Sequence, residues 1–338
     1  MDKTGIGKSE TLTADSRTPS GSESRGADWS TGVKSPSVAI IILIWNGQDD
    51  TVECLESLRK DTYSSKKVIV VDNGSSDGSA AVIRARFPEV TLIETGANLG
   101  FTGGNNVGIR HAIAHGADYV YILNNDTTVE PDSLSALIAA AEAAPKFGLL
   151  APVMHYFDPP REIWFAGSRI VLASGLAVHD NSRNPNRTEA PYEVPWVSGC
   201  AMLMPASLAS KLGGFDERYY LTSEDVDLSL RVSREGYAVV TVPAARIYHK
   251  GGKSGKRISG IGYYYVVRNK LLLVKNHCGK GYVFAALRIV GFHLWDLVRR
   301  RREAKVRLRY FRSVIDAVHD HLLRRYGPYR STAVKTTI

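Results

Sequence analysis

The sequence predicts an α/β protein with a mostly parallel sheet flanked by helices and a helical appendage at its C-terminal end. Short apolar, β-branched runs alternate with helical patterns from residue 38 to about residue 144, as in a doubly wound sheet. The chain has 338 residues, of which 44% are hydrophobic, enough for one large domain plus an appendage or for two modest domains. An apolar stretch and a basic helical pattern then follow at 281–338.

Composition narrows the classes of function. The three cysteines, Cys54, Cys200 and Cys278, are too few and too scattered for a disulfide framework or a zinc site, and they fit a reducing cytosol. The net charge of +9 is compatible with a nucleic acid, an anionic membrane or a phosphorylated substrate. Residues 1–36 have no apolar periodicity and no hydrophobic signal region, so we predict a disordered tail.

The first half of the chain predicts a regular alternation of strand, loop and helix. Each apolar run is too short for a helix and ends abruptly at polar or glycine-rich residues. We interpret these runs as buried strands whose carboxyl ends meet at one edge of the sheet. The predicted strands are 38–44, 67–71, 90–94 and 119–123. A helical pattern runs through Val52, Leu55 and Leu58, and further helices are expected at 79–87 and 106–115.

The run at 119–126 is the centre of this prediction, because it ends in Asn124, Asn125 and Asp126. The ligand crevice of an open α/β sheet lies outside the carboxyl ends of its strands, so Asp126 is placed where a hard cation bridging phosphates would sit. Oxygen ligands suit Mg²⁺ or Mn²⁺, and one or two carboxylates suffice beside substrate phosphates. The alternative is a polar turn before a helix that begins near Pro131.

Polar loops after residues 44, 71 and 123 converge on the same edge, and the glycine-rich segment 96–106 can cover it. Asp72 suits hydrogen bonding to a base or ribose, while glycines let backbone N–H groups approach phosphates near a helix N-terminus. The segment matches neither the P-loop nor the dinucleotide-binding fingerprint. These features predict a nucleotide site, with an ordinary Asx-rich turn at 72–78 as the alternative.

The second half of the chain has a weaker pattern. Residues 147–192 predict a partly antiparallel extension that shapes an acceptor pocket, and strands are predicted at 196–205 and 239–242. His249 follows the last strand and precedes a basic, glycine-rich loop. A lone histidine is more often structural than a ligand, but here it could complete a metal site while a lysine neutralises a diphosphate. The candidate lysines are Lys250, Lys253 and Lys256.

A second group of acids lies at the start of a predicted helix. Glu224, Asp225 and Asp227 crowd this helix start, and the helix ends before Gly236, a natural residue to follow a helix. A carboxylate here could serve as the general base for an attacking sugar hydroxyl. The alternative is helix capping, because Thr222 and Asp225 have the spacing of a capping box.

Four motifs occur in order along the chain: DNGSSD at 72–77, NLGFTGGN at 98–105, LNNDT at 123–127, and GGFDE at 213–217 leading to EDVDL at 224–228. With these motifs the chain resembles a family 2 glycosyltransferase of the rhamnosyltransferase-like branch, over about residues 38–275. The resemblance implies the GT-A type of fold, a Rossmann-like, mostly parallel sheet flanked by helices, with the C-terminal helical appendage added to it.

The resemblance implies roles for individual residues. Asp72 would contact the base, Asp126 would end an Asp-x-Asp metal motif that begins here with Asn124, and His249 would be a metal ligand for Mg²⁺ or Mn²⁺. Asp225 would be the catalytic base of a single inverting displacement. The predicted acceptor-binding residues are Trp196, Glu224 and Asp227, and the predicted donor-binding residues are Trp45, Asn46, Asp72, Ser75, Asp77, Asn98, Gly100, Gly103, Gly104, Asn105, Asn124, Asn125 and Lys253.

The resemblance implies transfer from a nucleotide-diphosphate sugar, with dTDP-rhamnose by analogy to the branch, to a glycan or polyprenyl-diphosphate-linked acceptor in cell-surface polysaccharide synthesis. The alternatives are a UDP-sugar-dependent transferase of the same family and a catalytically silent module that binds nucleotide sugars or a membrane surface. A nucleotidyltransferase is not expected, because the chain lacks the Gly-x-Gly-x-x-x-Arg sequence of that class. The catalytic domain is predicted at 37–275, with a donor half at 37–145 and an acceptor half at 146–275.

The C-terminal segment 276–338 is predicted to be basic, amphipathic and helical. Its stretch at 281–298 is apolar, but charged residues and a histidine interrupt it, so it is too short and too polar for a membrane span. The arginines at 299–302 and the basic helix after them predict peripheral contact with an anionic membrane at its cytoplasmic face. The alternative is a helical hairpin packed on the catalytic domain. A nucleic-acid partner is not expected, because no nucleic-acid-binding motif accompanies the charge.

Overall fold

A computed structural model describes residues 35–329 except 161, 181, 252–259 and 300–303. The predicted N-terminal tail lies outside the described residues except for its last two, and the predicted donor residue Lys253 also lies outside them. From Ser35 onward the chain belongs to one unit.

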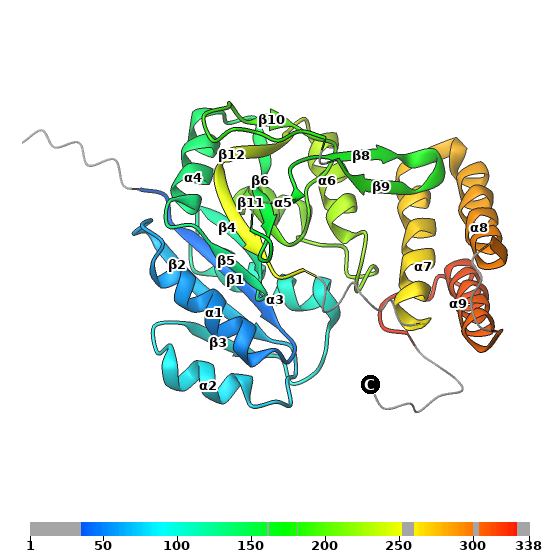
Figure 1. Cartoon of the computed structure of the whole chain (residues 1–338), viewed down its shortest axis with the longest axis horizontal. Coiled ribbons are helices and arrows are strands. Elements are labelled where there is room, and N and C mark those ends of the chain that lie inside the picture. Colours follow the sequence, from blue (N-terminus) through cyan, green and yellow to red (C-terminus); the bar gives the residue numbers. More distant parts are fainter. Residues whose placement is uncertain (1–34, 161, 181, 252–259, 300–303, 330–338) are drawn as a thin grey trace, which may run out of the picture. The chain divides into compact units, whose positions relative to one another are not determined.

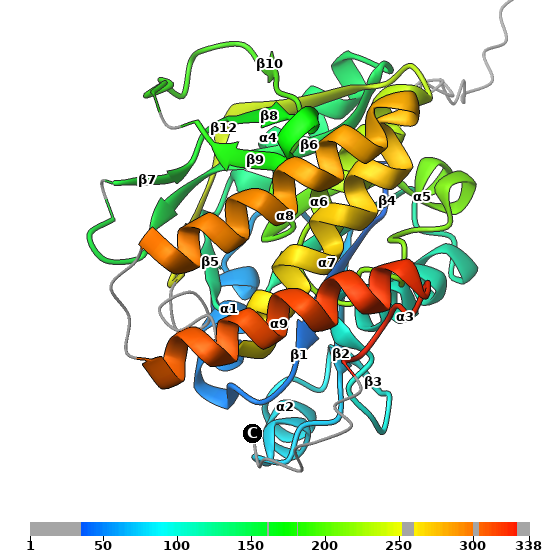
Figure 2. The same ribbon diagram turned by 90° about the vertical axis from the view of Figure 1, so that its right-hand side faces the viewer.

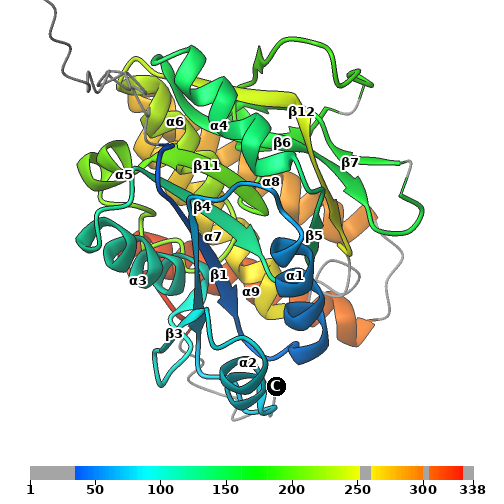
Figure 3. The ribbon, with the colours of Figure 1, turned by 90° about the vertical axis from the view of Figure 1, so that its left-hand side faces the viewer.

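Parallel strands from the first half of the chain form one end of the sheet, in the order β4-β1-β2-β3 with β3 at the edge (Figure 1). β1 pairs in parallel with β2 on one side and with β4 on the other. Its aliphatic sequence VAIIILI is almost wholly buried, as expected for a strand that helices cover on both faces. Accordingly, α1 and α3 lie on opposite sides of these strands (Figure 3). The bounds are β1 (Val38–Ile44), α1 (Gln48–Arg59), β2 (Lys66–Asp72), α2 (Ser79–Arg86), β3 (Thr91–Glu94), α3 (Gly100–Ala114) and β4 (Tyr119–Asn124).

The second half of the chain extends the same sheet with mixed pairings. β11 runs antiparallel to β4 and β6, and β12 runs parallel to β6. β5 pairs with the end of β12 and sets Thr127 opposite His249. The predicted partly antiparallel extension is therefore confirmed, and β8 and β9 form a separate hairpin. The bounds are β5 (Thr127–Val129), α4 (Ser133–Ala143), β6 (Phe147–Tyr156), β7 (Ile163–Phe165), β8 (Ser168–Val171), η1 (Leu172–Ser174), β9 (Leu176–His179), β10 (Tyr192–Glu193), β11 (Ala201–Pro205), α5 (Ala206–Leu212), α6 (Glu224–Arg234) and β12 (Ala238–His249).

The glycine-rich segment corrects one prediction. It was expected to be a loop as far as residue 106, but α3 begins at Gly100 and includes most of it. The physical reason is close packing of the helix on the sheet. A β-carbon at Gly104 would lie 2.3 Å from Leu43, and one at Gly108 would lie 2.4 Å from Ile41. Glycine therefore lets α3 approach β1, and this packing outweighs the low helix propensity of glycine.

Three helices form the C-terminal part of the described chain: α7 (Gly260–His277), α8 (Tyr282–Arg299) and α9 (Ala304–Leu322), with the short turn η2 (Gly279–Gly281) between the first two. Figure 2 shows them side by side. They pack around their own apolar cluster, which includes Tyr264, Leu271, Ile289 and Val314. The predicted helical appendage is confirmed.

The stretch Gly279–Arg299 meets the length and composition of a membrane-spanning helix among the described residues, although its sequence was expected to be too short and too polar. Length and composition alone do not distinguish a span from a helix that lies on a surface. One face of α8 packs inward through Ala285, Ile289 and Leu297, so the helix is part of the folded domain.

Candidate active site

The loops after β1 and β2 are joined to each other by hydrogen bonds. The backbone N–H of Asn46 donates to Ser75 Oγ at 2.8 Å, and the N–H of Ser76 donates to Asn46 Oδ1 at 2.9 Å. Asn46 has a positive φ of 60°, a conformation that asparagine tolerates better than most residues. Trp45 stands beside this junction with 47% of its surface exposed. The structure therefore brings three predicted donor residues together at the carboxyl edge of the sheet.

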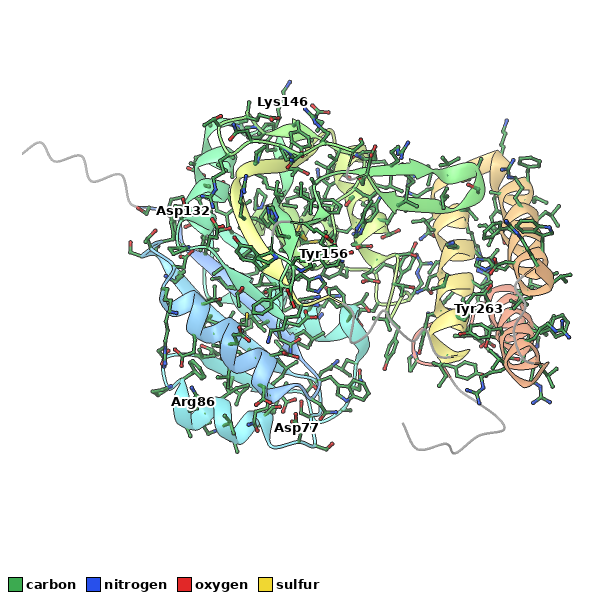
Figure 4. All side chains as sticks on the ribbon, viewed as in Figure 1. Asp77, Arg86, Asp132, Lys146, Tyr156 and Tyr263 are labelled. Carbon is green, nitrogen blue, oxygen red and sulfur yellow. The ribbon has the colours of Figure 1, made fainter. Side chains whose placement is uncertain are left out.

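Asp77 lies in the loop before α2 (Figure 4), and its hydrogen bonds connect the starts of α1 and α2. Its Oδ2 accepts from the N–H of Gly47 at 2.8 Å and from Gln48 at 3.3 Å, and its Oδ1 accepts from the N–H of Ser79 at 3.0 Å. Slight burial alone would raise the pKa of Asp77, but these hydrogen bonds outweigh burial and lower it. The carboxylate thus holds both loops through their backbone.

The end of β2 is joined to the segment before α3. Asp72 is buried, and its Oδ1 accepts from the N–H of Ser75 at 2.8 Å. Asn73 accepts from the N–H of Leu99 at 2.9 Å and donates to Asn98 Oδ1 at 3.1 Å. Sequence reasoning missed Asn73, although it stands inside the DNGSSD motif.

The start of α3 contacts the loop that precedes α6. Gly100 has a φ of +74°, and a β-carbon there would lie 2.4 Å from the ring of Tyr220. The N–H of Phe101 donates to the carbonyl of Tyr220 at 2.7 Å. Gly103, Gly104 and Asn105 are buried within α3. The first two N–H groups of this helix are therefore bound within the protein, that of Gly100 by Asn98 Oδ1 and that of Phe101 by backbone, and its glycines make packing contacts.

Asp126 and His249 form a pair where β5 meets the end of β12. Asp126 Oδ1 lies 3.2 Å from His249 Nε2, and both side chains are partly shielded from solvent. The ring of Trp164 packs edge-on against His249, with centroids 4.4 Å apart. Of the two neighbouring amides, Asn125 donates to Thr51 Oγ1 at 3.0 Å, and the carbonyl of Asn124 accepts from Thr127 Oγ1 at 2.6 Å.

This pair fits a divalent cation with few protein ligands. Two adjacent ligands of an octahedral ion at about 2.1 Å lie about 3 Å apart, close to the observed separation of Asp126 and His249. Among the described residues no group of three or more His, Cys, Asp or Glu side chains gathers at one point. Substrate oxygens and water commonly supply the other ligands of such an ion. Nearby Lys250 pairs with Asp50 at 2.7 Å and with Glu53 at 2.5 Å, which balances its charge.

Asp225 lies at the first turn of α6 and is held by backbone donors. Its Oδ2 accepts from the N–H of Gly199 at 3.1 Å, and its Oδ1 accepts from the N–H of Val226 at 2.8 Å. Burial raises the pKa of Asp225 above its ordinary value despite these bonds. The capping-box alternative is wrong, because Ser223 occupies the N-cap with a φ of 66° and makes no side-chain capping bond.

The two acids beside Asp225 have different surroundings. Glu224 is 6% exposed, and burial together with the charge of Asp225 places its pKa well above its ordinary value. Asp227 Oδ1 lies 2.8 Å from His277 Nε2, and its Oδ2 accepts from Arg231 Nε at 2.8 Å. Burial alone would raise the pKa of Asp227, but the bond from His277 and the charge of Arg231 lower it. Asp227 therefore binds α6 to α7.

A series of aromatic contacts runs from His249, the partner of Asp126, to Trp196. The ring of Trp164 lies 4.4 Å from His249 and 4.7 Å from His179, whose ring lies 5.5 Å from Trp196. Trp196 is buried, and its indole N–H donates to the carbonyl of Arg169 at 3.3 Å. A positive charge on His179 would lower the pKa of Asp225, so the two groups act on each other. Sequence reasoning missed Trp164 and His179, which lie where the sequence pattern is weakest.

Comparisons with known proteins identify the family. The family described as Glycosyl transferase family 2 matches residues 39–212. The chain is 34% identical over 224 residues to N-acetylglucosaminyl-diphospho-decaprenol L-rhamnosyltransferase of Mycobacterium tuberculosis, covering 60% of this chain and 72% of the relative. It is 29% identical over 224 residues to galactofuranosyltransferase GlfT1 of the same organism, covering 64% of this chain and 71% of the relative.

Solved structures share the fold. A crystal structure of GalNAc-T7 with UDP, GalNAc and Mn²⁺ has a TM-score of 0.60 at 12% identity and covers 86% of this chain and 58% of that one. The mannosyltransferase PcManGT of Pyrobaculum calidifontis, in complex with GDP-Man and Mn²⁺, has a TM-score of 0.54 at 16% identity and covers 87% of this chain and 89% of that one. The predicted GT-A type of fold is confirmed. The chain belongs to glycosyl transferase family 2, and it is a glycosyltransferase.

Proposed function

We propose that this glycosyltransferase moves a sugar, with inversion, from a nucleoside-diphosphate donor to a glycan or polyprenyl-diphosphate-linked acceptor in cell-surface polysaccharide synthesis. The observation that carries the proposal is the pairing of Asp126 with His249 near a separate, backbone-held Asp225. The mycobacterial relative, named for L-rhamnose transfer to a decaprenol-linked sugar, favours rhamnose, carried as dTDP-rhamnose.

In this proposal Asp225 is the general base. The acceptor oxygen attacks the anomeric carbon as the bond from that carbon to the diphosphate oxygen breaks, and Asp225 takes the hydroxyl proton. A raised pKa suits this task because the carboxylate then holds the proton more firmly. The two backbone N–H groups fix its direction, which supplies part of the rate through positioning. Glu224 would contact the acceptor beside Asp225. The buried side chains of Trp196 and Asp227 would support the wall of the acceptor pocket.

The donor would lie over the loops of the first half of the chain. Asp72, Ser75 and Asn98 are our candidates to meet the base and ribose, and exposed Trp45 is our candidate to stack on the base. Asp126 and His249 would hold Mg²⁺ or Mn²⁺, which when bound would stabilise charge on the departing diphosphate. Lys253, which lies outside the described residues, is our candidate to neutralise the charge of that diphosphate.

The donor side is tested by calorimetric titration with dTDP-rhamnose and with UDP-sugars, each with and without Mn²⁺ or Mg²⁺. We expect one donor to bind in a metal-dependent manner, and we expect Asp126→Ala and His249→Ala to abolish the metal dependence. Binding of a UDP-sugar alone would move the assignment to a UDP-dependent transferase. Metal-dependent binding with no transfer to any acceptor would favour the silent module.

We further propose that residues 276–338 rest on the cytoplasmic face of an anionic membrane, beside a catalytic domain at 37–275. On α8, Phe284 has 61% of its surface exposed and Trp295 has 52%, and arginines flank this apolar face. Such a surface would place a lipid-linked acceptor near Asp225. Phe284→Ser with Trp295→Ser should reduce sedimentation with anionic vesicles, and equal sedimentation of wild type and variant would contradict the role. The other large exposed apolar side chains of α8 and α9 among the described residues are Val283, Leu287, Phe292, Val298, Val306, Leu308, Phe311, Ile315 and Leu322.

A further inference from the structure

We propose that Arg268 and Asn269, on α7, are positioning residues that hold the loop 218–222 and thereby aim Asp225. This inference rests on the proposed function, because it gives Asp225 the role of base. Neither residue belongs to the four motifs or to the candidate site, and both are fully buried. Their side chains are directed at backbone carbonyls of the segment that leads into α6.

The loop has an unfavourable backbone conformation. Tyr220, Thr222 and Ser223 have φ values of 65°, 73° and 66°. Residues with a β-carbon rarely adopt this region, and they keep it only where the surrounding structure imposes it. Ser223 is the N-cap of α6, and Asp225 follows two residues later, so the backbone path of this loop sets where the carboxylate points.

Asn269 supplies much of that restraint. Its Nδ2 lies 2.9 Å from the carbonyl of Tyr219, 2.6 Å from that of Leu221 and 2.9 Å from that of Thr222. These three carbonyls face a single amide, and the left-handed residues Tyr220 and Thr222 lie within the same segment. An aspartate in its place would present only acceptors to carbonyl oxygens.

Arg268 holds the start of the same loop. Its Nη2 donates to the carbonyls of Arg218 at 3.0 Å and Tyr219 at 2.9 Å, and its Nη1 donates to the carbonyl of Gly327 at 2.6 Å. The guanidinium is 0% exposed and lies beside the ring of Tyr265, 5.0 Å from its centroid. The planar fork reaches three carbonyls at once, which the single ammonium of lysine cannot reproduce.

The remaining carbonyl of the loop faces the donor half of the protein. Tyr220 accepts from the N–H of Phe101, at the start of α3. The loop is thus held between α3 on one side and α7 on the other, with Gly327 of the C-terminal region completing the contact. By this arrangement the C-terminal helices contribute to the position of the base as well as to any membrane contact.

The test compares Arg268→Lys and Asn269→Asp with Arg234→Lys. Arg234 makes the matched control, because it also joins α6 to α7, through the carbonyls of Asn276 and His277, but at the exposed far end of the helix. We expect kcat to fall about a hundred-fold in the two test variants, as for a misplaced catalytic group. Donor affinity and the number of donor-binding sites per chain should stay at the wild-type values, and the control should match wild type. A purely structural defect would instead lower binding capacity and kcat together.

Two further measurements keep the proposal falsifiable. In an Asp225→Asn background, Arg268→Lys should add little further loss, because both changes act through one carboxylate. Amide hydrogen exchange over residues 219–227 should be faster in both test variants and unchanged in Arg234→Lys. Unchanged exchange in both test variants would overturn the proposal whatever the transferase assays show. A wild-type protein that transfers no sugar would overturn the proposed function, while exchange would still decide whether Arg268 and Asn269 hold the loop.

Discussion

Two regions of the molecule are held together in different ways: the donor edge, which is the loops after β1 and β2, and the acceptor edge, which is the loop before α6. At the donor edge the loops after β1 and β2 bind each other, and Asn46 and Ser75 are only 29 positions apart. At the acceptor edge the loop before α6 is held by Arg268, 49 positions after Tyr219, and Gly327, 59 positions after Arg268. The loops of the donor edge are thus held by bonds within the first half of the chain, whereas the loop of the acceptor edge is held by helices that follow the catalytic sequence motifs.

The sharpest way to separate the two edges is Asp225→Asn. We expect kcat to fall by roughly 10²–10⁴, the usual contribution of a general base. Donor affinity should not change, because the carboxylate bonds to Gly199 and Val226 and not to the donor loops. Rate measurements at saturating substrates, with calorimetry for the donor, check this. Turnover like that of wild type would remove Asp225 from the mechanism.

The next effect tests how the acceptor edge is held. Asp227→Asn should lower the free energy of unfolding at pH 7 by about 3 kcal/mol, because a buried pair with Arg231 is broken. The folded pKa of Asp227 lies below its ordinary value of 3.8, so its stabilisation is present above that value and is lost as pH falls through the lowered pKa. Urea unfolding should therefore show a difference in unfolding free energy between wild type and Asp227→Asn that is smaller at pH 3 than at pH 7.

A matched control for Asp227 lies at the other end of α6. Glu235 pairs with Lys211, and both side chains are exposed. Glu235→Gln should leave the free energy of unfolding unchanged within error, because solvent screens such pairs. Equal losses in the two variants, or a gap independent of pH, would show that burial of the Asp227 pair has no special effect.

A third change acts where the two edges touch. Gly100→Ala should destabilise the protein by about 1–3 kcal/mol more than Gly116→Ala, because the new methyl group would lie 2.4 Å from the ring of Tyr220. Gly116 has nearly the same φ, +73° against +74°, but nothing within 4 Å, so it reports the backbone cost alone. Chemical denaturation of both variants gives the difference. Equal losses would mean that α3 and the loop adjust freely around this contact.

Local chemistry explains which parts of the fold could be predicted from the sequence. The strand at 38–44 and the helix start at Ser79 follow from an apolar run and a turn motif, and the structure has both. The glycine-rich segment could not be predicted in this way, because its helix depends on contact with Leu43 and Ile41 of a distant strand. Helix propensity is a property of the residue type alone, whereas packing depends on which side chains lie opposite the residue.

The residues of the candidate site also fall into those that the sequence could predict and those that it could not. Asp72 ends β2, Asp126 lies two residues after β4, and Asp225 lies in the first turn of α6, so sequence position indicates where each side chain lies. The left-handed loop before α6 could not be predicted, because its conformation depends on Asn269, 47 positions after Thr222. His179 and Trp164 were missed for a similar reason, since β7 and the β8–β9 hairpin have little periodicity of their own.

The smallest effect concerns the donor edge itself. Asp77→Asn should reduce stability by about 1 kcal/mol, the usual loss when a capping carboxylate is weakened, because an amide can accept at only one of the two positions now bonded to Gly47 and Ser79. Donor affinity should weaken several-fold while kcat at saturation stays near wild type, since the loops that move carry donor contacts and Asp225 is held elsewhere. Titration and steady-state rates measured on one preparation separate the two quantities. A fall in kcat with donor affinity intact would mean that the two edges are not independent, and that the donor loops also take part in placing the base.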